Sequence, residues 1–337
     1  MRISESISKN ITESSVGHFL NKFKMKHRRD TFFFEDILAN FIKECEKKGY
    51  EKEILLLGQK WLDLCLGQTI KPIFKKAPVI FMNSILKQVW INLCLIDDMK
   101  TTKKGNVVII ETKGEALTRV MGKNNLMKGA YLGIVNVIFD SKAKLKKASQ
   151  TKKKCRYVIE LSKKPCLHFK AKDKTLYDRL NSQTNKKGPG LKNALKQGIF
   201  RLDKKNKIFF RGKHIIAGES TLSHLIGNMD ILIESIPKIS FEYFSNVIEE
   251  ESSIEEKLIL LKNLLQIMGW GQVTIIENKN SIKLEIRNPP YGLQAEEDNW
   301  IFIINCALGY LWLFDKNFKT EKIKNGHKMV SATFSKS

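Results

Sequence analysis

Long hydrophobic runs are scarce in this sequence of 337 residues. The longest uncharged apolar run, Trp300–Phe314, has 15 residues, whereas a helix needs about 20 to cross a bilayer. The N-terminal segment contains no apolar run of the kind that forms the core of a signal peptide. We therefore expect a cytoplasmic protein that does not insert into a membrane.

Cysteine is also scarce, and its spacing fits neither a disulfide framework nor a metal centre. The six cysteines are scattered, and four of them lie in apolar runs typical of helices. This pattern is typical of free thiols in a reducing compartment. Zinc sites usually combine two close pairs of ligands, and Cys166 with His168 is a single pair. We expect these two residues and Cys155 to be unrelated structural residues.

Catalytic signatures are missing as well. No histidine has a second histidine four residues away or a nucleophile motif close behind it. Gly188 and Gly190 flank a proline in a lysine-rich polar stretch, which predicts a linker rather than a phosphate-binding loop. We predict no catalytic residue, no metal and no cofactor, and we favour a non-enzymatic protein.

Positive charge is in excess. Lys and Arg number 59 against 35 Asp and Glu, which gives a net charge of +24, but only nine of the 59 are arginine. Because asparagine is abundant too, a codon bias can account for part of the lysine content. The belt Lys142–Lys174 carries twelve Lys and one Arg against two acids. A belt that neutralises phosphates gives salt-sensitive affinity for nucleic acid.

Helices and strands alternate toward the C-terminus in a pattern typical of an α+β fold. Ser253 and Glu256 form a capping-box sequence, and apolar residues follow at helical spacing until Gly269. The strand predicted at 281–287 alternates apolar and charged residues, so one face is expected to be wet. The other elements predicted after this helix are a strand at 272–277, a helix at 299–314, and strands at 319–323 and 328–334.

The same order of elements occurs about 175 residues earlier. Tyr131–Gly133 resembles Ala307–Gly309 within the apolar helix of each copy. The elements predicted for the first part are helices at 35–48, 51–66 and 80–99, strands at 106–112 and 156–161, and a later hairpin at 198–202 and 208–211. We interpret the order as an internal duplication, and two unrelated α+β domains are the alternative.

The duplication predicts the domain organisation. We expect a domain at 1–175, a basic linker at 176–195 and a second domain at 196–337, each with a small antiparallel sheet packed with helices. An intramolecular duplication often replaces the twofold contact of a homodimer. The two domains are therefore expected to form a pseudo-dimer.

Short motifs of both copies resemble the 4-vinyl-reductase domain family, also described as hydrocarbon-binding domains. The resemblance covers about two thirds of the chain. Its residues in the second copy are Met268–Gly271, Val273–Ile276, Ile282–Ile286, Asn288–Gly292 and Ala307–Gly309. Its residues in the first copy are Gly58–Trp61, Tyr131–Gly133 and Cys155–Tyr157. The second copy has His327–Met329 where the first has that cysteine.

The family resemblance implies ligand binding more than catalysis. Relatives include chlorophyll-pathway proteins, sensor domains of phenol-responsive regulators and subunits of vesicle-tethering complexes, so the fold does not fix the function. The sequence has no redox-cofactor motif to support a reductase activity.

We expect a protein that binds a small hydrophobic ligand or acts as an adaptor for a protein partner. The pocket of each copy would lie between the sheet and the glycine-containing helix. The expected lining residues are Met127, Tyr131, Ile134 and Val135 in the first copy and Tyr291, Trp300, Ile304, Leu308 and Trp312 in the second.

The alternative is a nucleic-acid-associated regulatory protein that uses the basic region between the domains. Its expected contacts are Lys152, Lys153, Lys154 and Arg156. Aromatic residues of the region, such as Tyr157 and Phe209, would stack bases if exposed, but apolar neighbours favour a place in the core for both. Nucleic acid is therefore a possible partner that the sequence does not favour.

Overall fold

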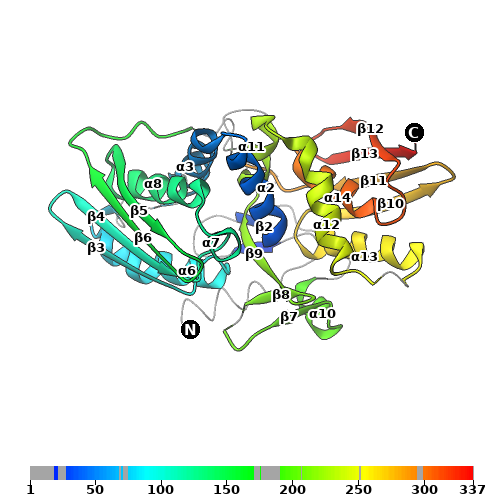
Figure 1. The fold of residues 1–337 in the computed structure, drawn as a ribbon, viewed down its shortest axis with the longest axis horizontal. Coiled ribbons are helices and arrows are strands. Elements are labelled where there is room, and N and C mark those ends of the chain that lie inside the picture. The colour runs from blue at the N-terminus through cyan, green and yellow to red at the C-terminus, as the bar shows by residue number, and fades with distance from the viewer. Residues whose placement is uncertain are drawn as a thin grey trace.

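The chain forms an α+β fold in which helices pack against three antiparallel sheets (Figure 1). The computed structural model describes residues 19–21, 28–67, 70, 75–170, 175, 190–205, 207–249, 252–293 and 299–336. Among these residues, no helix has both the length and the apolar character needed to cross a membrane.

One four-stranded sheet, ordered β3-β4-β6-β5, lies on the left of Figure 1 with its helices. Residues alternate between a buried face, which includes Val108 and Ile110, and an exposed face, which includes Lys100 and Arg156. The elements of this group are α3 (Glu51–Gly67), α5 (Pro78–Phe81), a π-helical turn (Met82–Leu86), α6 (Lys87–Asn92), β3 (Asp98–Lys104), β4 (Val107–Lys113), α7 (Thr118–Met121), α8 (Asn125–Phe139), β5 (Ala143–Gln150) and β6 (Lys154–Leu161). Helix α2 (Glu35–Lys47) precedes them in the chain and lies at the centre of Figure 1.

The second four-stranded sheet, β10-β11-β13-β12, has the same strand order and lies on the right. In both sheets one long helix, α8 or α14, connects the first two strands to the last two. The elements of this group are α11 (Thr221–Met229), a 3-10 turn (Ile233–Ser235), α12 (Ile236–Ser245), α13 (Ile254–Ile267), β10 (Gln272–Asn278), β11 (Ser281–Arg287), α14 (Ile301–Leu311), β12 (Phe318–Lys324) and β13 (Met329–Lys336).

A five-stranded sheet lies between the two groups. Its β7–β8 pair confirms the hairpin predicted at 198–202 and 208–211, whereas the sheet as a whole was not predicted. Its order is β1-β2-β9-β8-β7, so β2 pairs with β9 across more than 180 residues of sequence. Helix α10 (Leu191–Lys196) precedes β7. The strands are β1 (Phe19–Asn21), β2 (Arg28–Phe34), β7 (Phe200–Leu202), β8 (Ile208–Phe210) and β9 (Lys213–Glu219).

The central strands join the two groups reciprocally. Phe32 and Ala217 lie opposite each other in the antiparallel β2–β9 pair. The Phe32 N–H donates to the Met268 carbonyl at 2.8 Å, and the Ala217 N–H donates to the Leu93 carbonyl at 2.9 Å. The strand from the first half of the sequence is thus bonded to the second group, and the strand from the second half to the first. Buried side chains of both groups form one continuous apolar cluster.

Most predicted elements are present, and the exceptions have local reasons. The capping box is confirmed, because the Ser253 side chain accepts from the Glu256 N–H while the Glu256 carboxylate accepts from the Ser253 N–H. The helix predicted at 80–99 is wrong beyond Asn92. Cys94 has a φ of 60°, which turns the chain, and Asp98–Lys104 is the strand β3.

About half of the basic belt Lys142–Lys174 is β-sheet. Its first part forms β5 and β6, two of the four strands of their sheet. Of the predicted linker 176–195, residues 176–189 lie outside the described residues, and Leu191 begins α10. The division into two domains stays a prediction.

Candidate functional site

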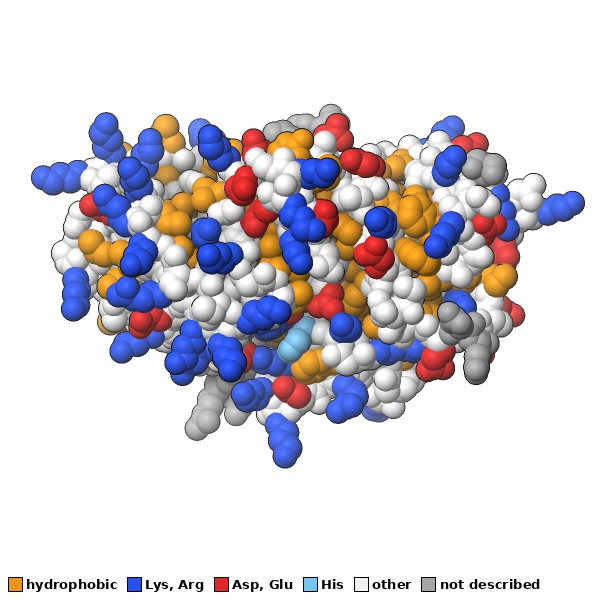
Figure 2. Space-filling model, viewed as in Figure 1, with side chains coloured by type: hydrophobic (Ala, Val, Ile, Leu, Met, Phe, Trp, Pro, Cys, Tyr) orange, Lys and Arg blue, Asp and Glu red, His pale blue; other side chains and the backbone are white. Residues whose placement is uncertain are grey.

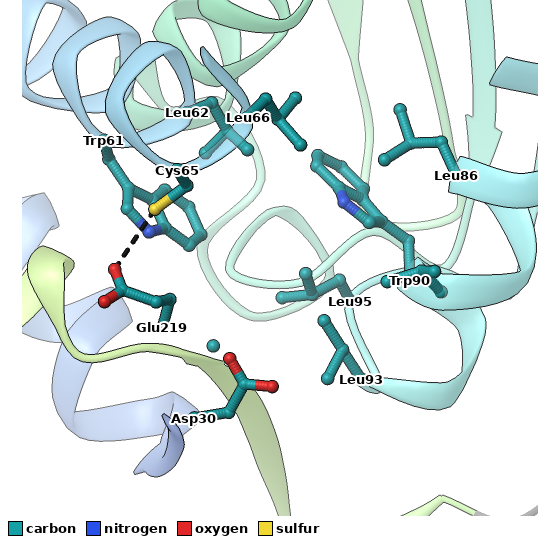
Figure 3. Close-up of a pocket in the computed structure, with 12 residues that line it drawn as sticks. Asp30, Trp61, Leu62, Cys65, Leu66, Leu86, Trp90, Leu93, Leu95 and Glu219 are labelled. Carbon is teal, nitrogen blue, oxygen red and sulfur yellow. Dashed lines mark hydrogen bonds between the residues drawn. The ribbon is translucent and has the colours of Figure 1, made fainter. Parts of the chain in front are cut away.

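A cavity of about 70 Å³ lies between β9 and the helices α3 and α6 (Figure 3). Its walls are mainly apolar. In the close-up, Trp61, Cys65 and Glu219 lie at one end and Trp90 and Leu86 at the other. The lining residues are Asp30, Trp61, Leu62, Cys65, Leu66, Leu86, Val89, Trp90, Leu93, Leu95, Gly218 and Glu219.

Two buried carboxylates border this cavity. Asp30 and Glu219 are cross-strand neighbours at one end of the β2–β9 pair, and each is 3% exposed. The Glu219 Oε2 accepts from the Cys65 thiol at 3.2 Å and from the Thr221 N–H at 2.9 Å. Thr221 begins α11, and the partial positive charge of a helix N-terminus stabilises a carboxylate there. The site therefore combines aromatic walls with acidic groups.

The place in the β2–β9 pair that is equivalent to Gly218 is occupied by a large side chain, Phe33. Gly218 follows Ala217 in β9, and Phe33 follows Phe32 in β2, so the two residues hold equivalent places in the pair. The Phe33 ring packs edge-on against Trp270 with centroids 5.6 Å apart. A cavity of only about 10 Å³ is left beside it. Glycine at 218 leaves the corresponding space open next to Trp61, whose ring a Cβ at 218 would meet at 3.5 Å.

A wider depression of about 580 Å³ lies on the exposed face of the sheet β3-β4-β6-β5. Its cations are Lys100, Lys113, Lys154 and Arg156, and its acids are Asp98 and Glu111. Lys100, Glu111 and Arg156 form one row across three strands. Asp98 is paired with Lys87 at 2.5 Å, and this partner holds the pKa of the Asp98 carboxyl below its ordinary value.

The exposed side of this sheet carries cations in each of its four strands, together with the acids Asp98, Glu111 and Glu160. We call it the basic face, and its cations are Lys100, Lys104, Lys113, Lys144, Lys147, Lys154 and Arg156. In Figure 2, Lys and Arg side chains crowd over the half of the molecule where Figure 1 shows β3–β6, with few acidic side chains among them. Of the predicted contacts, Lys154 and Arg156 thus lie on the basic face, and Lys152 and Lys153 lie in the adjoining turn.

The predicted pocket residues of the first copy lie in the packed core. Met127, Tyr131, Ile134 and Val135 are all buried in α8, and none of them lines a described cavity. The Tyr131 ring stacks on Tyr157 with centroids 4.4 Å apart. Burial, followed by the nearby Glu115 charge, raises the pKa of Tyr131 well above its ordinary value. Tyr131 is therefore neutral over the physiological pH range.

The glycines of α8 explain why this helix packs closely against its neighbour and lines none of the described cavities. A Cβ on Gly129 would lie 1.9 Å from the Leu55 carbonyl oxygen of α3, and one on Gly133 would lie 2.5 Å from the Gln59 carbonyl oxygen. The glycines thus let two helix backbones touch. Gly309 of α14 does the same against the Pro237 carbonyl oxygen of α12, at 2.2 Å.

The predicted residues of the second copy are also core residues or packing anchors. Trp300, Ile304 and Leu308 are buried, and the Trp312 Nε1–H donates to the Phe318 carbonyl. The Tyr291 ring contacts the His327 ring edge-on with centroids 5.4 Å apart. These five residues do not line the described cavities either.

All six cysteines are free, and five are buried, as the sequence predicted. Cys155 and Cys166 have separate surroundings. Cys155 is buried on β6, where burial raises the pKa of its thiol to about 12. Cys166 and His168 lie after β6 and reach Asp63 of α3.

Sequence reasoning missed the buried acids, which include Glu115 and Asp63 as well as Asp30, Glu35 and Glu219. Glu115 accepts hydrogen bonds from the hydroxyls of Thr112, Thr118 and Tyr157. Asp63 is fully buried, and burial raises the pKa of its carboxyl, although His168 and the Phe169 N–H oppose that shift. The sequence pattern that could have indicated Asp63 is a single acidic residue within an otherwise apolar stretch of α3.

Comparison with protein-family models, curated proteins and solved structures gave no match.

Proposed function

We propose that the chain binds double-helical nucleic acid through the basic face. The observation that carries this proposal is the open 580 Å³ depression with Lys100, Lys113, Lys154 and Arg156 around it. Phosphate groups are recognised by lysine and arginine, and their counterions are released on binding.

The distribution of charge along the chain supports selection rather than codon bias. Residues 101–200 hold 24 Lys and Arg against 6 Asp and Glu, whereas residues 201–337 hold 18 against 17. A codon bias acts along the whole chain and would raise lysine in both parts. The excess is instead concentrated in the part of the chain from which β4, β5 and β6 come, and six of the 24 cations lie within these three strands.

The absence of aromatic side chains favours a duplex over a single strand. Single strands are held largely by bases stacked on aromatic rings. None of the described outward-facing residues of β3, β4, β5 and β6 is aromatic, and Tyr157 points into the core. The lysine, arginine and threonine side chains of the face are of the kinds that contact a phosphate backbone.

The test is a fluorescence-anisotropy titration of a labelled DNA duplex at several salt concentrations. We compare the triple variant Lys100→Gln, Lys154→Gln, Arg156→Gln with the control Lys283→Gln, Arg287→Gln, Lys322→Gln on the other four-stranded sheet. Each lost phosphate contact lowers the slope of log affinity against log salt by about 0.9. We expect the slope to fall by about 2 to 3 in the first triple only.

Both triple variants remove three positive charges. The control therefore distinguishes an effect of the basic face on binding from an effect of the net charge of the chain. Equal weakening in the two triples, no binding at low salt, or a preference for single strands would each contradict the proposal.

The cavity beside Gly218 supports a second candidate, binding of a small hydrophobic ligand. This function is the one that the resemblance to hydrocarbon-binding domains implies. The equivalent place in the second group is filled by Phe33, so the two groups differ at this point. A volume of about 70 Å³ accommodates roughly two water molecules or the end of a larger ligand.

Native mass spectrometry of the purified chain tests this second candidate. We expect a small organic adduct that is released on denaturation and lost in Gly218→Phe, which fills the space. Gly218→Ala leaves most of the space and should keep the adduct. A folded Gly218→Phe chain that retains it would place the ligand elsewhere.

A further inference from the structure

Asp63, Cys166 and His168 bring together three kinds of metal ligand. One ligand atom from each lies within 4.8 Å of the other two. Asp63 comes from the C-terminal part of α3, whereas Cys166 and His168 come from the segment that follows β6. Carboxylate, thiolate and imidazole are the three protein ligands that zinc takes most often.

The separation of two ligand atoms fits a tetrahedral zinc ion. The His168 Nδ1 lies 3.2 Å from the Asp63 Oδ2. Two zinc bonds of about 2.0–2.1 Å spanning that distance enclose an angle of roughly 100–106°, close to the tetrahedral value. The Cys166 Sγ lies within 4.8 Å of the other two ligand atoms. Cys166 is partly exposed on a loop, so its side chain can rotate toward a zinc–sulfur bond of about 2.3 Å.

The outer partners of these ligands are also in place. The His168 Nε2 lies 3.3 Å from the Asp140 Oδ1, and the Asp63 Oδ1 accepts from the Phe169 N–H at 3.2 Å. In metal sites the second nitrogen of a histidine ligand usually donates to a carboxylate, which fixes the ring and its tautomer. The chain Asp140, His168, Asp63 has that arrangement.

The charge balance favours a divalent cation. A thiolate and a carboxylate together neutralise two positive charges, and the Asp63 carboxylate is fully buried. A buried carboxylate without a cation is costly. The thiol proton passes to the solvent when the metal binds, so affinity rises with pH.

We propose that Asp63, Cys166 and His168 bind one Zn²⁺, with Asp140 as a positioning residue and a water molecule as the fourth ligand. The ion would fasten the segment after β6 to α3. Other contacts already hold this segment nearby: the Ser141 hydroxyl donates to the Ser162 carbonyl at 2.7 Å, and the Lys142 N–H to the Lys164 carbonyl at 3.0 Å.

Cobalt titration of the chelator-stripped full chain tests the site. Co²⁺ bound to a thiolate gives a charge-transfer absorption in the near ultraviolet, and Zn²⁺ should abolish it at one equivalent. We expect Cys166→Ser to lose the band and His168→Gln to bind at least tenfold more weakly. The control His327→Gln removes an exposed histidine and should bind like the parent chain.

The variant Asp140→Asn distinguishes a metal-binding role of the three residues from a purely structural role. Asp140 has a φ of 48°, a conformation that asparagine also adopts readily, so this variant should fold. We expect it to keep the thiolate band with Zn²⁺ affinity lowered about 10- to 100-fold. A structural hydrogen bond alone would leave the metal affinity unchanged.

A measurement on the parent chain covers the case in which a variant does not fold. Cys166 is the one partly exposed cysteine, and Zn²⁺ should slow its alkylation at least tenfold in peptide mass mapping. Equal alkylation with and without Zn²⁺, no thiolate band at saturating Co²⁺, or a band that survives in Cys166→Ser would overturn the proposal.

Discussion

At the scale of single residues, the same amino acid has opposite roles in this chain. Gly129 allows two helix backbones to touch, because a Cβ there would lie 1.9 Å from the Leu55 carbonyl oxygen. Gly218 leaves a cavity open, because a Cβ there would meet the Trp61 ring at an ordinary 3.5 Å. The sequence alone associated a helix glycine with a pocket, whereas the open space lies beside a strand glycine.

This difference predicts opposite effects of one substitution. Gly129→Ala should lower the free energy of unfolding by about 3 kcal/mol, because α3 and α8 must separate. Gly218→Ala should raise it by about 0.5–1 kcal/mol, because alanine has less freedom in the unfolded chain. Urea unfolding of both variants checks the pair. A Gly129→Ala chain as stable as its parent would contradict the close helix contact.

At the scale of elements, a buried ion pair ties α2 to α7. Glu35, the first residue of α2, is fully buried and accepts from the Arg119 guanidinium at 2.6 and 2.9 Å and from the Leu117 N–H at 2.7 Å. Burial raises the pKa of the Glu35 carboxyl, and Arg119 acts against that shift. The pair connects helices that lie more than 80 residues apart in sequence.

Removing the cation should make stability depend on pH. Arg119→Met leaves the Glu35 carboxylate without its cation, which costs about 3–5 kcal/mol at pH 7. A carboxyl whose pKa is higher in the folded than in the unfolded chain binds its proton more tightly when folded. Its contribution to stability is therefore greatest below the unfolded pKa and is lost as pH rises through the folded pKa.

We therefore expect Arg119→Met to regain part of its stability, relative to the parent chain, between pH 7 and pH 5. Urea unfolding at both pH values measures this change. The control is Arg156→Met, whose exposed contact with Glu111 is 3.4 Å long and should cost less than about 1 kcal/mol. An equal loss at the two pH values would show that Glu35 does not titrate as described.

At the scale of the whole molecule, the β2–β9 pair makes the two groups of elements depend on each other. β2 comes early in the sequence and packs Phe33 against Trp270 and Phe302 of the second group. β9 comes later and bonds to Leu93 of the first group. Neither group has its complete core without a strand from the other half of the sequence.

Interdependence predicts one cooperative unfolding transition. Pulsed hydrogen exchange along a urea series, read by mass spectrometry, follows peptides from β4 and β11 in the same sample. We expect the two strands to lose protection at the same urea concentration. Two separate midpoints would instead support independent domains joined by a linker.

The candidate sites differ in how far the sequence could predict them. Lys154 and Arg156 of the basic face were predicted, because a run of charge is visible without a structure. Lys100 and Lys113 were missed, since they join the face through pairing with distant strands. Cys166 and His168 were expected to be unrelated structural residues, because their partner Asp63 lies about 100 residues earlier and reaches them only in the folded chain.

The sequence by itself determined the local elements. The capping box at Ser253, the stop near Gly269 and the alternation of 281–287 depend on residues a few positions apart, so their pattern was sufficient. Tertiary structure decided the rest. The end of the helix at Asn92, the central β2–β9 pair, the cavity at Gly218 and the cluster at Asp63 depend on contacts between distant segments. Burial and backbone pairing decide such contacts, and both exist only once those segments meet.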